Sequence, residues 1–112
     1  MAKASRGEVW LVSLPTGQGH EQQGERPAII LAEMDLARVV TLVPITSSPA
    51  ASKFPHTFKL IHSKENGLQT DSTVLVFQVT TIDINKLVHK LGELSEKDQK
   101  TLDALLTDFL KI

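Results

Sequence analysis

The chain has 112 residues and a mass of 12.3 kDa, with 12 Lys and Arg against 13 Asp and Glu, four His and no Cys. This length predicts one domain over residues 1–112. Without cysteine the chain cannot build a disulfide scaffold, a thiolate zinc site or a cysteine nucleophile. Its apolar runs are far shorter than the ~20 residues that span a bilayer, so we expect no membrane segment.

The N-terminus carries Lys3 and Arg6, but only a brief apolar run follows them. A secretory signal would need a longer apolar core, so we expect no signal peptide and a cytoplasmic protein.

Six short segments are predicted as strands, because β-branched and apolar residues cluster there between Gly, Pro and Asn turns. In chain order they are residues 8–14, 27–32, 38–46, 57–61, 73–79 and a weaker segment at 88–94. Pro44 cannot donate to a central ladder, so residues 43–46 are expected at an edge or a bulge. The pattern predicts a mainly β fold, a small barrel or curled sheet.

One helix is predicted at the C-terminus. Ser95 is its N-cap candidate, and Asp98 follows three residues later, close to a capping box. Apolar residues then recur at helical spacing and form one face, which we expect to pack on the sheet: Leu102, Leu105, Leu106 and Phe109.

The connection at residues 15–25, PTGQGHEQQGE, is long for a hairpin and rich in polar groups. It is either a functional loop able to move protons or a flexible glycine loop. Arg26 precedes Pro27 and is therefore expected to be extended at the strand end, where its guanidinium either captures a phosphate or carboxylate or is an ordinary solvated surface group. Further along, Thr46, Ser47 and Ser48 could bind a phosphate oxygen or cap a turn.

Charge is unevenly distributed. Residues 38–64 carry four bases, two histidines and no acid, whereas residues 92–112 carry five acids against three bases. This basic segment, which contains Lys53 and Phe54, is either a single-stranded nucleic-acid surface or an ordinary solvated face. The four histidines lack a metal-ligand spacing such as HExxH, and no phosphate-loop or GxSxG motif occurs, so we expect no metal and no cofactor.

Taken together, the strings RGEVWLVSLPTGQGHEQQGERPAIIL, VPIT and QVTTID, followed by the capped helix, resemble the MazF/PemK toxins of type II toxin–antitoxin systems, especially the Kid/PemK branch. The resemblance implies a small, strongly bent antiparallel sheet like an SH3-like barrel with a C-terminal helix. It also implies a homodimer that cuts single-stranded RNA, mostly mRNA, sequence-specifically and without a metal. Products would carry 2′,3′-cyclic phosphate and 5′-hydroxyl ends.

The same resemblance assigns roles to residues. Arg26 matches the essential arginine and Thr46 the active-site threonine, while Glu21 and His20 match the loop groups that act as base or acid. We further expect RNA contacts from the following residues: Gln22, Ser47, Lys53, Phe54, Phe77 and Gln78. A cognate antitoxin would inhibit by laying an acidic tail along the RNA site, and operator DNA would be bound only through that antitoxin.

The chain departs from the family pattern at the fifth predicted strand. Phe77 stands where an acid is common, Leu75 replaces an arginine, and Thr80 replaces a basic residue. Phe77 could instead stack a base and shift the cleaved sequence. Two alternatives follow: a weakened toxin that keeps only antitoxin and operator functions, or a non-catalytic binder like the gyrase poisons of this fold. Those poisons end their helix in Trp-Gly-Ile, whereas this chain ends in Leu-Lys-Ile.

Overall fold

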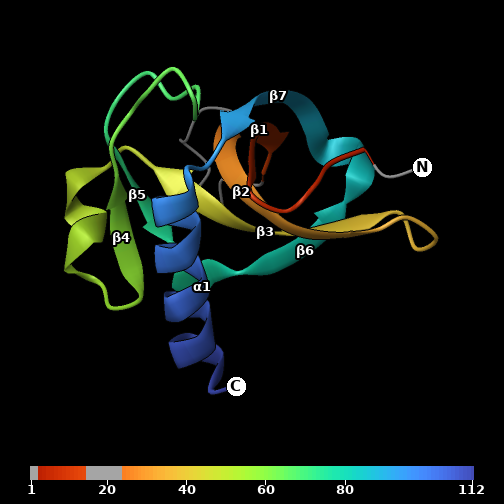
Figure 1. The fold of residues 1–112 in the computed structure, drawn as a ribbon. Helices are drawn as coiled ribbons and strands as arrows, with labels where there is room; N and C mark the ends of the chain where they lie inside the picture. The colour runs from red at the N-terminus through yellow and green to blue at the C-terminus, as the bar shows by residue number, and fades with distance from the viewer. Residues whose placement is uncertain (1–2, 15–23) are drawn as a thin grey trace.

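The computed structural model describes residues 3–14 and 24–112. Within these residues the chain forms seven strands and one α-helix, with three short 3-10 helices between them (Figure 1). The strands are β1 (Glu8–Ser13), β2 (Glu25–Met34), β3 (Val39–Thr46), β4 (Thr57–Leu60), β5 (Ser72–Leu75), β6 (Thr80–Asp83) and β7 (Leu87–Glu93). The helices are η1 (Pro49–Lys53), η2 (Val76–Gln78), η3 (Ile84–Lys86) and α1 (Glu96–Leu110).

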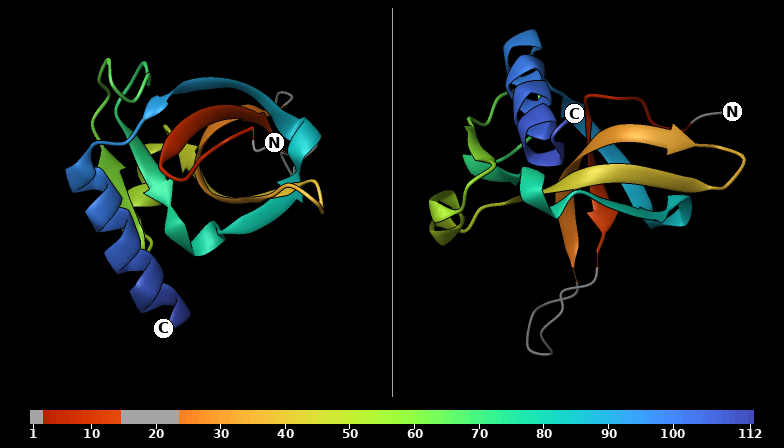
Figure 2. Two further views of the ribbon diagram at one scale, coloured as in Figure 1. Left: turned by 45° about the vertical axis from the view of Figure 1, so that its right-hand side comes forward. Right: turned by 90° about the horizontal axis from the view of Figure 1, so that it is seen from below.

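All strand pairs are antiparallel, and the strand order is β4-β5-β3-β2-β1-β7, with β6 also paired to β3. The sheet curls strongly upon itself, and α1 lies across one side of it near β4 and β5 (Figure 2). The predicted bent antiparallel sheet with a C-terminal helix is confirmed. Among the residues that the structure describes, no helix is both long enough and apolar enough to cross a membrane.

The curled sheet has a hydrophobic core on each face, because successive side chains along a strand point to opposite faces. One core contains Val9, Ile29 and Ile45 with Leu102 and Leu106 of α1, as the helical spacing predicted. The other lies inside the curl and is built from the following residues: Ala4, Trp10, Val12, Ala28, Ile30, Val40, Leu42, Ile84 and Leu87. Burial on both faces holds the strand ends in fixed positions, which is what a site at those ends requires.

Strand β3 has two different neighbours along its length on the side away from β2. Its residues 39–42 pair with β6, whereas Ile45 and Thr46 pair with β5. Val43 and Pro44 pair with β2 between these two zones. The expected edge at residues 43–46 is therefore found only at Val43 and Pro44, as a local gap between two partners, and is wrong for Ile45 and Thr46, which pair with β5.

The predicted fifth strand at residues 73–79 is wrong in its second half. The strand ends at Leu75, the chain turns through η2, and a strand that the sequence did not predict, β6, follows. The reason is that β5 and β6 pair with separate parts of β3, so the chain must step out of the sheet between them. Val76 is buried in the core beneath α1, while Phe77 and Gln78 are left on the turn.

Helix α1 begins as expected. Ser95 is its N-cap: the Ser95 hydroxyl accepts a bond from Asp98 N at 3.1 Å and also donates to Asp98 Oδ2 at 3.1 Å. Near the other end, Phe109 packs against His56 with ring centroids 5.1 Å apart. The apolar stripe therefore fixes the helix on the sheet.

Candidate active site

Arg26 and Thr46 lie near each other at adjoining ends of β2 and β3. The pairing of these two strands ends with Ala28 opposite Pro44. Arg26 and Thr46 each lie two residues beyond that pair, and both line the same hollows. Arg26 is the second residue of β2, so the extended conformation expected before Pro27 is found.

Two adjoining hollows are lined by both Arg26 and Thr46. The first, of about 170 Å³, also contains Gln78 and Leu75. The second, of about 200 Å³, also contains Ser47 and Gly24. The structure thus brings together four of the expected site residues: Arg26, Thr46, Ser47 and Gln78.

The Thr46 hydroxyl is oriented by the turn that follows it. Its oxygen accepts a hydrogen bond from Ser48 N at 3.2 Å. This contact uses a lone pair and leaves the hydroxyl proton to donate. The turn-capping role expected of these hydroxyls is therefore found at Thr46, whereas the phosphate-binding role stays a prediction.

A second group of expected residues gathers beside this centre. The rings of Phe54 and Phe77 lie with centroids 5.5 Å apart at an angle of 51°, and Lys53 Nζ is 5.5 Å from the Phe54 ring centroid. Phe54 is 45% exposed. Phe77 is followed directly by Gln78 of the first hollow, so this aromatic pair adjoins the Arg26 centre.

His20, Glu21 and Gln22 lie outside the described residues, so their expected roles stay predictions. The segment that contains them joins β1 to β2. Leu14 N donates to Gly24 O at 2.7 Å at the base of this connection, two residues from Arg26.

The basic segment at residues 38–64 does not form one patch. Arg38 lies in the turn before β3, whereas Thr46 ends that strand, about 25 Å away at the usual rise per residue. Lys59 lies across β5 from Thr46, at the site end of β3. If residues 38–64 form a nucleic-acid surface at the Thr46 end of β3, Arg38 is therefore not part of it.

Acids from outside that segment engage both of its histidines. His56 Nε2 lies 2.7 Å from Asp108 Oδ2 of α1, and His62 Nδ1 lies 2.6 Å from Asp71 Oδ1. The hydrogen bonds from the His62 side chain and backbone lower the pKa of Asp71. The hydrogen bond with His56 likewise lowers the pKa of Asp108, with a smaller contribution from Lys111. Both carboxylates therefore stay charged to a lower pH than an unpaired aspartate does.

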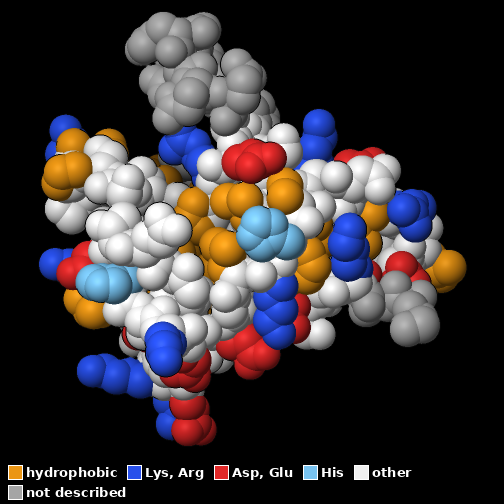
Figure 3. All heavy atoms as spheres, turned by 90° about the horizontal axis from the view of Figure 1, so that it is seen from above, with side chains coloured by type: hydrophobic (Ala, Val, Ile, Leu, Met, Phe, Trp, Pro, Cys, Tyr) orange, Lys and Arg blue, Asp and Glu red, His pale blue; other side chains and the backbone are white. Residues whose placement is uncertain are grey.

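A third hollow of about 430 Å³ has mainly apolar walls. It contains Leu11, Leu68, Leu91 and His89, and it shares Ser47 with the Arg26 centre. Figure 3, which looks onto the face above β1 and β7, shows hydrophobic side chains gathered around a histidine. Within residues 3–14 and 24–112, no three His, Asp or Glu side chains gather as metal ligands would.

Sequence reasoning missed residues that reach the site only through strand pairing. Lys59, Ser72 and Thr73 lie beside the Thr46 end of β3, yet they are distant from it in sequence. Their only signal was β alternation, which gives the face of each residue but not its neighbours across the sheet.

Comparison with known proteins places this arrangement in a family. A model described as PemK-like, MazF-like toxin of type II toxin–antitoxin system matches residues 5–110. Endoribonuclease MazF9 of Mycobacterium tuberculosis is 31% identical over 109 residues, which span 90% of this chain and 91% of that protein. Endoribonuclease MazF of Staphylococcus saprophyticus is 35% identical over 101 residues, spanning 88% of this chain and 83% of that protein.

Solved structures share the fold at lower identity. MazF from Deinococcus radiodurans has a TM-score of 0.76 at 19% identity, with 97% of each chain covered. A MazE–MazF structure from the same organism has a TM-score of 0.72 at 23% identity, covering 100% of this chain and 99% of that one. The match of the family model along nearly the whole chain, and the two relatives above 30% identity, show that this protein belongs to the PemK-like, MazF-like toxins of type II toxin–antitoxin systems.

Proposed function

We propose that this protein is the toxin of a toxin–antitoxin pair and cuts single-stranded RNA, mostly mRNA, at specific sequences without a metal ion. The proposal rests on the observation that Arg26 and Thr46 together line two adjoining hollows. A fixed guanidinium beside a hydroxyl donor is suited to an anion such as a phosphodiester. The two relatives matched along most of the chain are both named endoribonucleases, which supports the same reaction here.

The proposed step is an internal transfer. The ribose 2′-oxygen attacks the adjacent phosphorus, the bond from phosphorus to the 5′-oxygen breaks, and the products are a 2′,3′-cyclic phosphate and a 5′-hydroxyl. Charge builds up on the non-bridging phosphate oxygens in the transition state. Arg26 and the Thr46 hydroxyl would stabilise that charge, which is the role of preorganised donors.

Two proton transfers complete the step. A base must take the 2′-hydroxyl proton and an acid must give one to the leaving 5′-oxygen. We assign these roles to Glu21 and His20, in either order, by the resemblance to the Kid/PemK branch. Phe77 offers no carboxylate at the position where relatives commonly carry one, so the loop groups become the main candidates.

The partners follow from the family. Solved structures with this fold include a MazE–MazF complex. We propose an antitoxin whose acidic tail competes with RNA for the Arg26 centre, and operator DNA bound only through that antitoxin. We further propose a homodimer acting in the cytoplasm.

The test is cleavage of an mRNA by the purified protein in excess EDTA, with mass analysis of the product ends. We expect cyclic-phosphate ends, and no cutting where the nucleotide 5′ of the cleaved bond is 2′-deoxy. Arg26→Ala should lower kcat by about 10²–10³-fold, because a preorganised charge donor is lost. Arg38→Ala is the matched control, since Arg38 lies at the far end of β3. Equal activity of wild type and Arg26→Ala would contradict the mechanism.

One observation favours a second candidate, a weakened toxin that retains only antitoxin and operator functions. The Phe77 ring packs on Phe54 at 5.5 Å where the family pattern places an acid. Intact RNA after prolonged incubation with wild-type protein, together with tight antitoxin binding, would select this candidate.

A further inference from the structure

His56, in the turn between η1 and β4, makes contacts that the proposed mechanism does not use. Its Nε2 lies 2.7 Å from Asp108 Oδ2 near the end of α1, and its ring packs on Phe109 with centroids 5.1 Å apart. Its backbone oxygen accepts a hydrogen bond from Val76 N, the first residue of η2, at 3.0 Å. One residue thus joins the end of α1 to the beginning of η2.

The backbone of His56 adopts a conformation that is uncommon outside glycine. Its φ is 59, in the left-handed region. A residue keeps such a conformation where the surrounding contacts determine it. The His56 side chain is 23% exposed, and its Nε2 donates to Asp108 because an ionised carboxylate can only accept. The two contacts with α1 therefore hold both the ring and the left-handed backbone.

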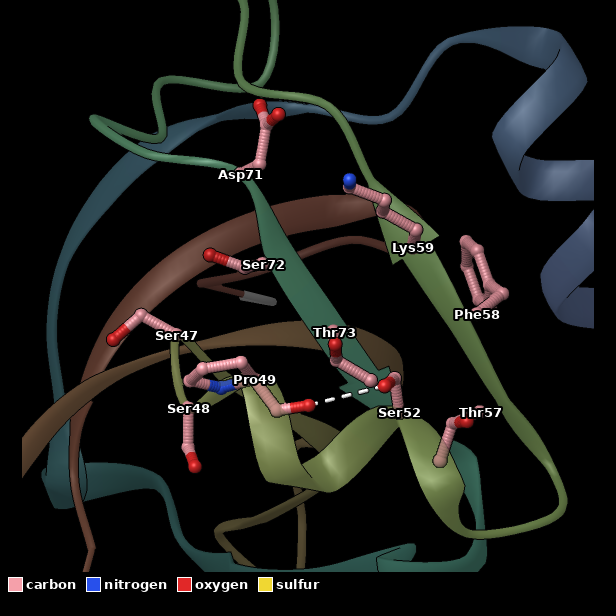
Figure 4. Close-up of a pocket in the computed structure, with 10 residues that line it drawn as sticks. All are labelled: Ser47, Ser48, Pro49, Ser52, Thr57, Phe58, Lys59, Asp71, Ser72 and Thr73. Atoms are coloured by element: carbon pink, nitrogen blue, oxygen red, sulfur yellow. Dashed lines mark hydrogen bonds between the residues drawn. The ribbon is translucent and has the colours of Figure 1, made fainter.

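The turn that contains His56 is also bonded internally. Ser52 Oγ donates to Pro49 O at 3.0 Å, which is the dashed line in Figure 4. Thr57 Oγ1 donates to Phe54 O at 2.8 Å, and Figure 4 shows Thr57 where the chain passes from η1 into β4. These bonds make the turn one unit, so a shift of His56 displaces the turn as a whole.

Helix η2 is attached to this turn at two points. The first is the bond from Val76 N to the backbone oxygen of His56. The second is the contact between the Phe54 and Phe77 rings, whose centroids are 5.5 Å apart. Helix α1 packs on η2 as well, and Val76 is fully buried in the core that contains Leu102. The place of η2 in the fold therefore depends on the turn and on α1 together.

The third residue of η2 is Gln78, which lines the hollow of Arg26 and Thr46. Gln78 is exposed, so the backbone of η2, rather than core packing of its own side chain, determines where its amide lies. A side-chain amide can donate to a phosphate oxygen beside Arg26. A displacement of η2 would thus move a polar group of the site without removing any.

We propose that His56 is a positioning residue: held by Asp108, it fixes η2 so that Gln78 lies beside Arg26 and Thr46. This inference rests on the proposed RNA cleavage and links the end of α1 to that site. Loss of the Asp108 contact should slow cleavage although Asp108 touches neither Arg26 nor Thr46, and the loss should act through Gln78.

The first experiment compares Asp108→Ala with Asp103→Ala. Asp108 is 67% exposed, so its replacement leaves the core intact. Displacement of a group in a site slows the chemical step, and we expect a single-turnover rate about tenfold below wild type. The Kd for an RNA oligomer blocked by 2′-deoxy substitutions should change less than about twofold, because all the cations of the site remain.

Asp103→Ala is the matched control. It also removes one acid from α1 and breaks an ion pair, that of Asp103 Oδ1 with Arg6 Nη2 at 2.5 Å. The net charge of the two variants is therefore the same, and Asp103→Ala should cleave RNA like wild type. Equal cleavage rates for the two variants would overturn the proposal.

The second experiment tests the route from Asp108 to the site. Asp108→Asn keeps an acceptor oxygen for His56 and should stay within about threefold of wild type. His56→Gly permits the left-handed backbone but removes the ring, so it should slow cleavage as Asp108→Ala does. In a Gln78→Ala background, Asp108→Ala should have little further effect, because the two changes act on one group. A full additional loss in that background would overturn the route through Gln78.

The third experiment measures amide hydrogen exchange and needs no RNA. The Val76 amide should exchange about tenfold faster in Asp108→Ala than in Asp103→Ala, whereas the amides of β1 and β2 should match in the two variants. Equal protection of Val76 would overturn the proposal even if the protein cuts RNA. A wild type that cuts no RNA, with faster exchange at Val76 in Asp108→Ala alone, would remove the nuclease proposal and keep the link from α1 to η2.

Discussion

At the residue scale, the Thr46 hydroxyl is the group whose role can be measured most directly. It sits in the hollows of Arg26 and keeps its proton free to donate, because its oxygen accepts from Ser48 N. The resemblance predicted an active-site threonine at position 46. Its proximity to Arg26 depends on how β2 and β3 pair.

Replacing Thr46 by valine keeps the shape of the side chain and removes its donor. We expect kcat for RNA cleavage to fall by about 10²-fold, because a single preorganised donor to the developing charge is lost. Thr46→Ser should stay within a few-fold of wild type, since it retains the hydroxyl. Single-turnover cleavage of a short RNA checks this. Equal rates for Thr46→Val and Thr46→Ser would show that the hydroxyl does not act on the phosphate.

The buried side-chain amide of Asn66 stabilises the long connection between β4 and β5. Its Oδ1 accepts from Ser63 N and Leu68 N, both at 3.0 Å, and its Nδ2 donates to Ile61 O at 2.9 Å. Asn66 is 3% exposed, so each lost bond leaves a poorly solvated backbone group.

Asn66→Ala is therefore expected to lower the free energy of unfolding by about 2–3 kcal/mol, a fall in Tm of roughly 10 °C. Asn85→Ala, at an exposed position in η3, serves as the control and should change stability by less than ~0.5 kcal/mol. Thermal melts of both variants test the expectation. A melt of Asn66→Ala that matches the control would show that the turn holds without the amide.

At the element scale, the connection between β4 and β5 folds back on β7. Glu93 N donates to Glu65 O at 2.8 Å. Gly67 adopts φ +74, and a Cβ there would collide with the Leu91 backbone. The turn and the strand thus meet at backbone contact, which places Leu68 and Leu91 together beside the Arg26 centre.

The N-terminal arm is attached to β1 and β7 through Glu8. Its Oε1 accepts from Trp10 Nε1 at 2.8 Å and from Ser5 N at 2.9 Å, while Oε2 lies 3.2 Å from Lys90 Nζ. Burial by itself raises the pKa of Glu8, but these hydrogen bonds and the Lys90 charge outweigh it and the pKa is lowered. The folded state therefore holds the charged carboxylate more strongly than the unfolded state does.

This sets a direction for the dependence of stability on pH. The contribution of Glu8 is fully present above its unfolded pKa of about 4.3 and is lost as the pH falls through the lower folded value. Urea unfolding of wild type, followed by Trp10 fluorescence between pH 7 and pH 3, should show a falling midpoint in the acid range. Glu8→Gln should be less stable at pH 7 and should lose less on acidification. Parallel pH profiles for the two proteins would mean that Glu8 does not contribute.

At the scale of the whole molecule, the net charge is low, but the acidic and basic residues lie in different parts of the fold. The helix α1, which carries acids, packs beside η2 and β4 and pairs its Asp108 with His56. The cations that reach the site end of the sheet are Arg26, Lys53 and Lys59, which suits local contact with RNA rather than general coating.

A homodimer is the remaining expectation at this scale. The resemblance to the family implies it, and the apolar hollow of Leu11, Leu68 and Leu91 adjoins the Arg26 centre through Ser47. Light scattering should give about twice the 12.3 kDa chain mass at micromolar concentration. A monomer that cuts RNA at the full rate would contradict a groove shared between two copies.

Much of the fold was predictable because its signals are local. Strand alternation located β1, β2, β3, β4 and β7 to within a few residues, and the cap and apolar stripe located α1. The failure at residues 73–79 had a tertiary cause. The apolar pattern of that segment is typical of one strand, and only the separate pairings of β5 and β6 with β3 make the chain leave the sheet after Leu75.

The sequence by itself determined the family, the helix, most strands and the identity of the residues that carry charge and hydroxyl groups. These depend on side-chain chemistry and on spacing along the chain. Only the tertiary structure decided which of them meet. It placed Thr46, Thr73 and Lys59 in one row, joined Phe54 to Phe77, and removed Arg38 from the site. The physical reason is that strand register and curl are set by long-range pairing and core packing, which periodicity along a single chain does not encode.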